Sequence, residues 1–284
     1  MNVSPLSGPA PVGIFDSGLG GLSVLRAVRA LLPAEQLVYV ADSRYAPYGQ
    51  RDDDFIADRT LAIGEWLMAQ GAKALVVACN TATAQSIEFV RERLPIPLVG
   101  VEPGIKPAAL QSSTRVAGVL ATQVTLRSAR FQALVERHAD GLRVLCQPGH
   151  GLVEAVERCD VGSPELLALL RGYLAPMLDA GADTLVLGCT HYPFLDTAIR
   201  SIVGERMTLI DTSVAIARQL ERVLGQHGLL ADTADDAHAS ARFYSTNDGA
   251  HLRMLAAALL GIDAQVECVR IPSRRTLELE TDAA

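Results

Sequence analysis

The stretch GAKALVVACNT, residues 71–81, decides the fold because its apolar run leads into a cysteine that two polar residues follow. A second stretch, GADTLVLGCTH at residues 181–191, repeats the pattern, with glycine, alanine, leucine, valine and cysteine at matching positions. Any two buried parallel strands share valines and leucines, so those residues alone indicate little. The cysteine at the same terminal position, followed each time by polar residues, predicts two similar half-structures that face each other.

Outward from these stretches, short apolar runs alternate with helical patterns. The apolar residues at positions 22, 25, 28 and 32, for example, place one stripe on one face of a helix. Such alternation with short connections predicts parallel βαβ units, hence an α/β fold with helices on both faces of each sheet. Strands are expected at residues 12–16, 37–41, 74–79, 98–101, 116–120, 142–146, 184–189 and 207–211.

A second correspondence extends the duplication toward the N-terminus. VGIFDS at residues 12–17 is similar to AGVLAT at residues 117–122, and the match puts Asp16 opposite Thr122. Each half of the chain therefore offers two polar strand ends, and the site is expected at the interface of two pseudo-symmetric α/β domains.

The expected partition gives the first domain two separate pieces of chain. Residues 103–211 form the second domain, and residues 1–102 together with the tail 212–284 form the first. In that tail, ARFYST at residues 241–246 is typical of a strand, and residues 248–260 are typical of a helix.

Composition excludes several classes of function. Hydrophobic residues make up 49% and charged residues 20% of the 284, as in ordinary globular enzymes. The net charge of −7 argues against the basic face of a nucleic-acid-binding protein. An aromatic content of 5% likewise disfavours a stacking platform for single strands.

The chain also carries the marks expected of a cytoplasmic protein. Residues 1–11 lack the basic start and apolar core of a signal peptide, and no apolar run approaches the ~18 residues of a membrane helix. Five cysteines, an odd number without tight spacing, favour reduced thiols over a disulfide framework. No membrane partner is expected.

Polar residues follow the strand ends where ligands bind in open parallel sheets. Cys79, Cys189, Asp16 and Thr122 are all expected at such ends. Hydroxyls, an amide and free N–H groups at helix starts suit a carboxylate ligand. The residues expected at those helix starts are Asn80, Thr81, Thr190 and His191.

Two thiols facing each other across a cleft offer one acid and one base on opposite sides of a small anion. His191 could lower the pKa of its neighbouring thiol or assist proton transfer. Asp16 could act as a base for Cys79 or bind a substrate ammonium. A nucleophilic Cys–His pair would leave the second cysteine unexplained. A zinc site wants about four ligands, usually with a C-x₂₋₄-C spacing that this chain lacks.

The remaining cysteines and two cofactor alternatives carry less weight. Free cysteines are mostly small core hydrophobes, which is the expectation for Cys146, Cys159 and Cys268. The turn DSGLGG at residues 16–21 partly matches a dinucleotide fingerprint, but the third glycine of that frame is replaced by Ser23. A pyridoxal-phosphate enzyme needs a Schiff-base lysine. The chain has only two lysines. Lys73 is expected at the start of a strand, away from the site, and Lys106 has no phosphate-binding glycine loop beside it.

These motifs together resemble the glutamate racemases of the cofactor-independent aspartate/glutamate racemase superfamily. The matching segments run in order along nearly the whole chain: GIFDSGLGGLSVL, YVADSRYAPYG, VVACNTATA, GVLATQVT, GLVE, LGCTHYP and FYST. The resemblance implies two pseudo-symmetric α/β domains and interconversion of L- and D-glutamate with no cofactor and no metal. It also implies a homodimer and a role in peptidoglycan synthesis. Another acidic amino acid, such as aspartate, is the alternative substrate.

The resemblance also implies roles for individual residues. Cys79 and Cys189 match the two catalytic thiols, which Asp16, His191 and Glu154 assist. The residues that match substrate contacts are Asp16, Ser17, Tyr48, Gly49, Asn80, Thr81, Thr122, Thr190 and His191. The chain departs from the family pattern at two points. It reads CQPGHG from Cys146, where Cys-Pro-Gly is common, and it has Ala121 in place of a glycine. The first departure bears on the alignment of Glu154.

Overall fold

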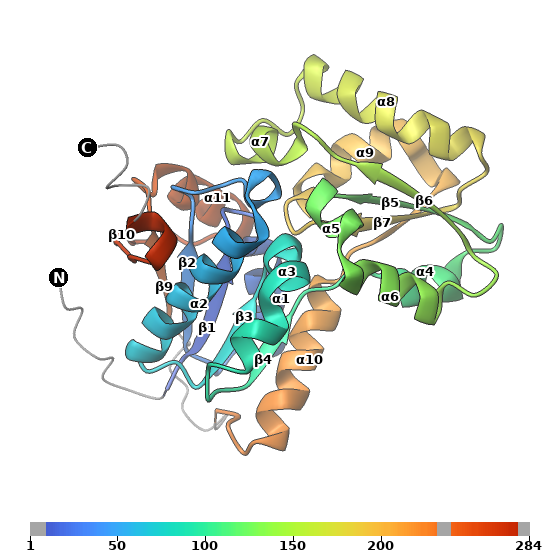
Figure 1. The fold of residues 1–284 in the computed structure, drawn as a ribbon. Coiled ribbons are helices and arrows are strands. Elements are labelled where there is room, and N and C mark those ends of the chain that lie inside the picture. The colour runs from blue at the N-terminus through green and yellow to red at the C-terminus, as the bar shows by residue number, and fades with distance from the viewer. Residues whose placement is uncertain (1–9, 232–239, 278–284) are drawn as a thin grey trace.

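The computed structural model describes residues 10–231 and 240–277. Within these ranges the chain forms two lobes, each built on its own parallel sheet with helices on both faces (Figure 1). The mixed α/β class with two parallel sheets is therefore confirmed. Residues 1–9, which carry most of the stretch judged not to be a signal peptide, lie outside the described residues.

The first lobe holds a six-stranded sheet in the order β10-β9-β2-β1-β3-β4. Every pair in it is parallel, and the register places Asp16 of β1 beside Ala41 of β2, which in turn lies beside Ser245 of β9. Several strands thus end together at one edge, as parallel strands must. The strands are β1 (Val12–Asp16), β2 (Leu37–Ala41), β3 (Ala74–Val77), β4 (Leu98–Gly100), β9 (Ala241–Ser245) and β10 (Val266–Cys268).

The second lobe holds a four-stranded sheet in the order β6-β5-β7-β8, again all parallel. Its neighbouring strands β5 and β7 correspond to the neighbours β1 and β3 of the first lobe, because β7 and β3 each lead to one of the two cysteines. The strands are β5 (Val116–Ala121), β6 (Arg143–Pro148), β7 (Thr184–Gly188) and β8 (Thr208–Ile210).

Helices sandwich both sheets, and strand residues alternate between the two sides. Ala74 and Val76 of β3 pack in the core under α1 (Leu22–Leu31) and α10 (Ser213–Gln226), whereas Leu75 and Val77 pack under α2 (Asp53–Ala69). The remaining helices of the first lobe are α3 (Asn80–Arg91) and α11 (Ala250–Leu260). Those of the second are α4 (Ile105–Gln111), α5 (Gln123–Arg127), α6 (Ala129–His138), α7 (Leu152–Glu157), α8 (Pro164–Asp179) and α9 (Asp196–Val203).

The tail of the chain returns to the first lobe. Helix α10 packs along α1, and β9 pairs with β2 in the first sheet (Figure 1). The exact domain boundaries proposed from the sequence stay a prediction.

The predicted strands are all present, with small shifts at their ends. The strands before the two cysteines end at Val77 and Gly188, so each cysteine lies in the connection that follows. The strand at 266–268 was not predicted, because three residues with the sequence VEC, mostly exposed, carry no periodic signal.

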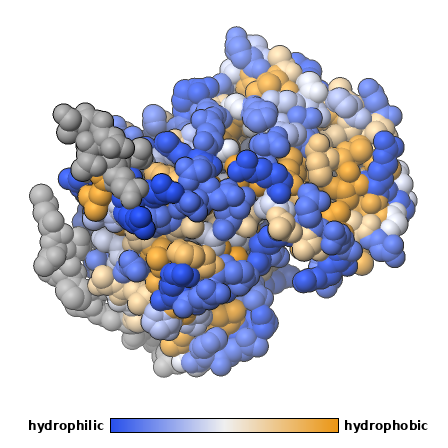
Figure 2. Space-filling view, in the orientation of Figure 1, coloured by the Kyte–Doolittle hydropathy of each residue, from blue (hydrophilic) through white to orange (hydrophobic). Residues whose placement is uncertain are grey.

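The predicted core role is wrong for two cysteines. Cys146 and Cys268 are exposed, since each lies in an edge strand, β6 or β10. Apolar residues on the face seen in Figure 2 gather in separate patches with hydrophilic residues between them. Among the described helices none is both long and apolar enough to cross a bilayer.

Candidate active site

Cys79 lies between β3 and α3 in the first lobe and caps the helix. Its Sγ accepts a hydrogen bond from the backbone N–H of Ala82 at 3.4 Å and lies 3.4 Å from Oγ of Ser17. The residue is only 5% exposed. The turn after β1 and the start of α3 therefore hold this thiol from two sides.

Cys189 occupies the matching place in the second lobe, directly after β7. Its Sγ lies 3.7 Å from Nδ1 of His191, which begins the short 3₁₀ helix η2 (Tyr192–Leu195) as its N-cap. Cys189 is 6% exposed, so both thiols are buried to the same degree. The two strand ends thus present a thiol each, and within the described ranges an imidazole lies beside the second of them alone.

Polar contacts join the two strand ends across the lobes. Thr190 donates from Oγ1 to Oδ1 of Asp16 at 3.2 Å, and the hydroxyls of Thr81 and Thr122 lie 2.9 Å apart. These contacts bring together residues that are 174 and 41 positions apart in the chain. Most of the residues predicted for the site therefore meet at one interface between the lobes.

A carboxylate that the sequence did not single out lies at the centre of this interface. Oε1 of Glu157 lies 2.6 Å from Nε2 of His191 and accepts a hydrogen bond from the backbone N–H of Leu19 at 2.7 Å. Glu157 belongs to α7, where LVEAVE carries glutamates at positions 154 and 157 on one helical face. The three-residue spacing of these glutamates is the feature of the sequence that could have identified Glu157 as a second candidate.

Glu154, the glutamate predicted to assist the second thiol, has a different partner. Its Oε1 accepts a hydrogen bond from Nε2 of Gln50 at 2.7 Å, and this bond is exposed. The carboxylate that contacts His191 is thus one turn further along α7. The predicted catalytic role of Glu154 stays a prediction.

The glycines of DSGLGG allow the first lobe to approach these groups. A Cβ at Gly18 would overlap the carboxylate of Glu157, and a Cβ at Gly20 would overlap the ring of His191 and the hydroxyl of Thr190. Side chains of the second lobe occupy the space over this turn. The glycines therefore serve close packing between lobes, the reading that competes with a dinucleotide fingerprint.

Electrostatics on the first side oppose ionisation of the thiol. Asp16 is fully buried, and burial raises the pKa of its carboxyl even though His191 and the N–H of Gly18 oppose the rise. Burial, and next the charge of Asp16, raise the pKa of Cys79 to about 12 against the opposing contact of Ser17. Without a ligand, Cys79 is therefore a protonated thiol at neutral pH.

Electrostatics on the second side favour a cation next to the thiol. Burial alone would lower the pKa of His191, but its contacts with Cys189 and Glu157 outweigh that and raise the pKa well above 6.5. The imidazole is thus held protonated between a sulfur and a carboxylate. A thiolate at Cys189 would have a cation within hydrogen-bonding distance.

The loop that carries Tyr48 and Gly49 is anchored from behind. The hydroxyl of Tyr48 donates to Oδ2 of Asp42, and Asp42 forms a fully buried ion pair with Arg59 at 2.7 Å. The ring of Tyr48 is therefore held in the core, in the 3₁₀ turn η1 (Tyr48–Gln50). Gly49 lies against Thr122, where an added Cβ would come within 3.3 Å of the Cβ of Thr122.

The side-chain amide of Asn80 is buried and free to bind a ligand. Asn80 is 3% exposed, yet neither Oδ1 nor Nδ2 of its side chain finds a hydrogen-bond partner among the described residues. A buried amide without partners costs free energy unless a ligand or water satisfies it. The unpaired amide beside Cys79 therefore fits a small polar ligand. In the described part of the chain, no three His, Cys, Asp or Glu side chains gather as a metal site would require.

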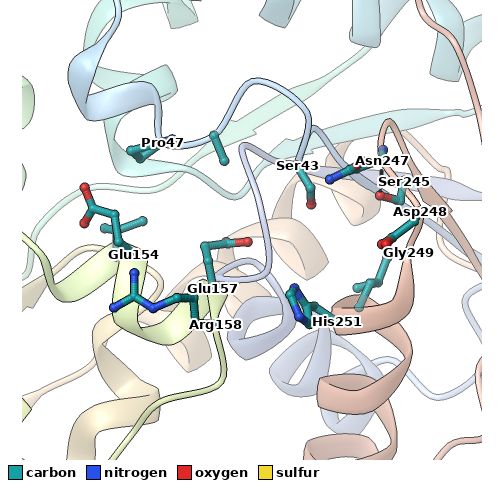
Figure 3. Close-up of a pocket in the computed structure, with 13 residues that line it drawn as sticks. Ser43, Pro47, Glu154, Glu157, Arg158, Ser245, Asn247, Asp248, Gly249 and His251 are labelled. Carbon is teal, nitrogen blue, oxygen red and sulfur yellow. Dashed lines mark hydrogen bonds between the residues drawn. The ribbon is translucent and has the colours of Figure 1, made fainter.

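A pocket of about 290 Å³ opens beside Glu157. Three segments surround it (Figure 3): the loop after β2 with Ser43 and Pro47, helix α7, and the turn from β9 into α11 with Asn247. A second, smaller pocket, of about 40 Å³, lies on the other side of Glu154 over Gly49 and Thr122. Both pockets lie where the lobes meet.

Known proteins resemble this chain in sequence and in fold. Residues 20–220 match the family described as Asp/Glu/Hydantoin racemase. The glutamate racemase of Ralstonia nicotianae is 62% identical over 252 residues, which cover 89% of this chain and 90% of that protein. The crystal structure of glutamate racemase isoform RacE1 from Bacillus anthracis superposes with a TM-score of 0.84 at 32% identity, covering 93% and 99% of the two chains. Escherichia coli glutamate racemase, solved in complex with L-glutamate and the activator UDP-MurNAc-ala, has a TM-score of 0.81 at 32% identity and covers 93% and 100%.

Proposed function

The chain belongs to the Asp/Glu/hydantoin racemase family, and from this premise we propose that it interconverts L-glutamate and D-glutamate by proton transfer at the α-carbon. The observation that carries the proposal is the pair of buried thiols, Cys79 and Cys189, at equivalent strand ends of the two lobes. The Escherichia coli relative binds L-glutamate, which supports the choice of substrate.

In the proposed reaction the thiols exchange roles with direction. A thiolate on one side takes the α-proton, and the electron pair of the broken C–H bond stays on the α-carbon and its carboxylate. The opposite thiol then delivers its proton to the other face of that carbon and becomes a thiolate. Each turnover thus moves the thiolate from one sulfur to the other, so L-to-D and D-to-L conversion start from opposite protonation states.

Each thiol needs a group that makes its thiolate accessible. On the second side His191, held protonated by Glu157, is that group. On the first side the charged group acting on Cys79 is the carboxylate of Asp16, and the substrate would bring the cation. An ammonium group next to Asp16 would offset the negative charge that keeps the pKa of Cys79 high, so the substrate itself would complete this half of the site.

The polar residues around the thiols are proposed to hold the substrate. Asn80 has an unsatisfied amide, and the hydroxyls of Thr81, Thr122 and Thr190 bridge the lobes where a carboxylate could take their place. Ser17, Tyr48, Gly49, Asp16 and His191 complete the proposed substrate contacts. Burial of both thiols excludes water from the carbanion-like state, where fixed dipoles stabilise charge more strongly than solvent does.

The biological setting follows from the family. D-Glutamate made by this reaction would supply peptidoglycan synthesis in the cytoplasm, and the active form is proposed to be a homodimer. No cofactor is required by the proposed chemistry, since the two thiols supply both the base and the acid.

Circular dichroism tests the function directly. Purified protein is expected to abolish the signal of L-glutamate and of D-glutamate, because racemisation ends in equal amounts of the two. L-Aspartate at the same concentration should keep its signal over the same period. Loss of the aspartate signal with glutamate unchanged would replace the proposed substrate, and stable signals from both amino acids would refute racemisation of acidic amino acids.

A further inference from the structure

Helix α7 sends two carboxylates across to the first lobe. Glu157 accepts from the backbone N–H of Leu19 at 2.7 Å, and Glu154 accepts from Nε2 of Gln50 at 2.7 Å. Figure 1 shows α7 at the junction of the lobes, beside the loop that contains η1. The contact of Glu157 belongs to the candidate active site through His191. The contact between Glu154 and Gln50 does not touch the thiols or His191.

Access to the site requires that contacts across the lobes break. Cys79, Cys189, Asn80 and Asp16 are each at most 6% exposed, so a free glutamate cannot reach them in this closed arrangement. Some cross-lobe contacts, such as the one between Thr190 and Asp16, are buried with the site. Others are exposed to solvent: the bond between Gln50 and Glu154, and the ion pairs of Arg127 with Asp53 and of Arg130 with Glu88. Among these exposed contacts, the bond of Gln50 involves α7, the helix that also carries Glu157.

The bond between Gln50 and Glu154 lies between two pockets at the junction of the lobes. The larger pocket beside Glu157 and the smaller pocket over Gly49 and Thr122 share Pro47, Val153 and Glu154 in their walls. The Gln50–Glu154 bond therefore lies at the wall between the two hollows at the junction of the lobes. In Figure 3 the carboxylate of Glu154 extends toward the loop with Pro47, while Glu157 points toward the pocket interior.

We propose that the hydrogen bond between Gln50 and Glu154 is the latch that holds α7 closed on the first lobe and thereby sets how tightly the substrate is retained. This inference rests on the proposed racemisation, and it makes Gln50 and Glu154 positioning residues. Gln50 directly follows Gly49, and Glu154 lies one helical turn before Glu157. Closing the latch therefore brings both the substrate loop and the partner of His191 into place.

The latch predicts an effect on affinity more than on turnover. Apparent affinity falls by the fraction of protein in the competent closed state, whereas bound substrate itself keeps a saturated enzyme closed. Gln50→Ala and Glu154→Ala are each expected to raise KM for both enantiomers about 3- to 10-fold, the usual range for losing one hydrogen bond, with kcat changed less than twofold. Because the enantiomers have equal free energy, kcat/KM must fall equally in both directions.

The double variant is the decisive measurement. Gln50→Ala/Glu154→Ala should be no worse than either single variant, since both remove the same bond. Glu154→Gln keeps an oxygen that accepts from Gln50 and should retain the wild-type KM. Gln226→Ala, an exposed glutamine on α10 with one hydrogen bond to Arg222, is the matched control and should change nothing.

Contrary outcomes separate the possible roles of Glu154. Additive losses in the double variant, or a fall in kcat for Glu154→Ala with Gln50→Ala silent, would overturn the latch and indicate direct action on the reaction. A loss in Glu154→Gln equal to that in Glu154→Ala would also overturn it, because charge rather than the bond would matter.

A second readout needs no turnover. The amide of Leu19, which donates to Glu157, should exchange its hydrogen several-fold faster in Gln50→Ala than in the wild type. Unchanged exchange would refute the latch even if racemisation is observed. Faster exchange in a protein that does not racemise glutamate would instead refute the proposed function and leave the latch standing.

Discussion

Cys79 and Cys189 occupy equivalent positions after β3 and β7, yet their neighbours carry opposite charge. Cys79 stands near Asp16, and its pKa is raised to about 12. Cys189 stands beside His191, whose own pKa is raised well above 6.5 by the sulfur and by Glu157. The backbone is thus nearly symmetric while the electrostatics are not.

This difference shows how a symmetric reaction can run on an asymmetric site. The raised pKa of Cys79 keeps the proton on that thiol, and the raised pKa of His191 places a cation beside Cys189. A thiolate at Cys189 would be stabilised by that cation, whereas a thiolate at Cys79 would face the charge of Asp16. Under the proposed function, a thiolate at Cys79 would become accessible when a substrate ammonium compensates Asp16, so the substrate would supply on the first side the cation that His191 supplies on the second.

The largest effect is expected from removing either thiol. Cys79→Ser and Cys189→Ser should each lower kcat/KM for racemisation roughly 10³–10⁴-fold without unfolding, because a hydroxyl is a far weaker base than a thiolate. In D₂O each variant should still exchange the α-proton of one enantiomer, and the two variants should differ in which one. Near wild-type racemisation by either would end the two-thiol assignment. If both variants exchanged the α-proton of both enantiomers, neither thiol could be assigned to one face of the α-carbon.

Removing the imidazole is expected to cost less than removing a sulfur. His191→Asn keeps polar atoms near Cys189 and Glu157 but abolishes the cation, and kcat should fall roughly 10²-fold. The basic limb of the pH–rate profile should move or vanish, since it would no longer report His191. A kcat within twofold of wild type, with the same limb, would mean that Cys189 does not depend on the cation.

Glu157→Gln tests the support of that cation and should lower kcat about tenfold, as expected when a hydrogen bond to a charged group is weakened. Because the charge of Glu157 helps raise the pKa of His191, the variant should titrate His191 at lower pH, which NMR of the ring can measure. The raised pKa also implies stability that is fully present below pH ~6.5 and lost as pH rises through the folded-state pKa, and the variant should lose part of it.

Glu136→Gln, on the exposed surface of α6, is the control for Glu157→Gln and should leave both kcat and the titration of His191 unchanged. An unaltered pKa of His191 in Glu157→Gln would show that the sulfur alone sustains the imidazolium. The difference between the two thiols would then come from the contact of Cys189 with His191, with no contribution from Glu157 of α7.

Sequence patterns predicted the thiols and their edge of the sheet because both follow from local rules. The repeat of Cys79 and Cys189 after apolar runs identifies strand ends, and strand ends in parallel sheets converge. The partner of His191 could not be chosen in the same way. Glu154 and Glu157 lie on one helical face of α7, and only the approach of the first lobe through Leu19 decides which of them meets the imidazole.

The high pKa of Cys79 was likewise beyond the sequence. It depends on burial under two lobes and on the charge of Asp16, a residue that sequence reasoning had considered as a base for the thiol. An aspartate at a strand end raises the pKa of a neighbouring thiol when its charge is unpaired, and raises it less when a cation lies beside the carboxylate. That depends on tertiary contacts and on the ligand, neither of which a pattern contains.

The smallest effect is expected from one of the two contacts that ease ionisation of Cys79, the other being the backbone N–H of Ala82. The hydroxyl of Ser17 lies 3.4 Å from Sγ and opposes the rise in the pKa of this thiol, so Ser17→Ala should raise that pKa further. If Cys79 is the less easily ionised thiol, conversion in the direction that begins with its thiolate should lose kcat about 3- to 5-fold, and the other direction less. Equal free energies of the enantiomers still require one common change in kcat/KM, so KM must shift with kcat in the affected direction. Ser201→Ala on α9 serves as the control, and an equal loss of kcat in both directions would show that the two thiols are matched once substrate is bound.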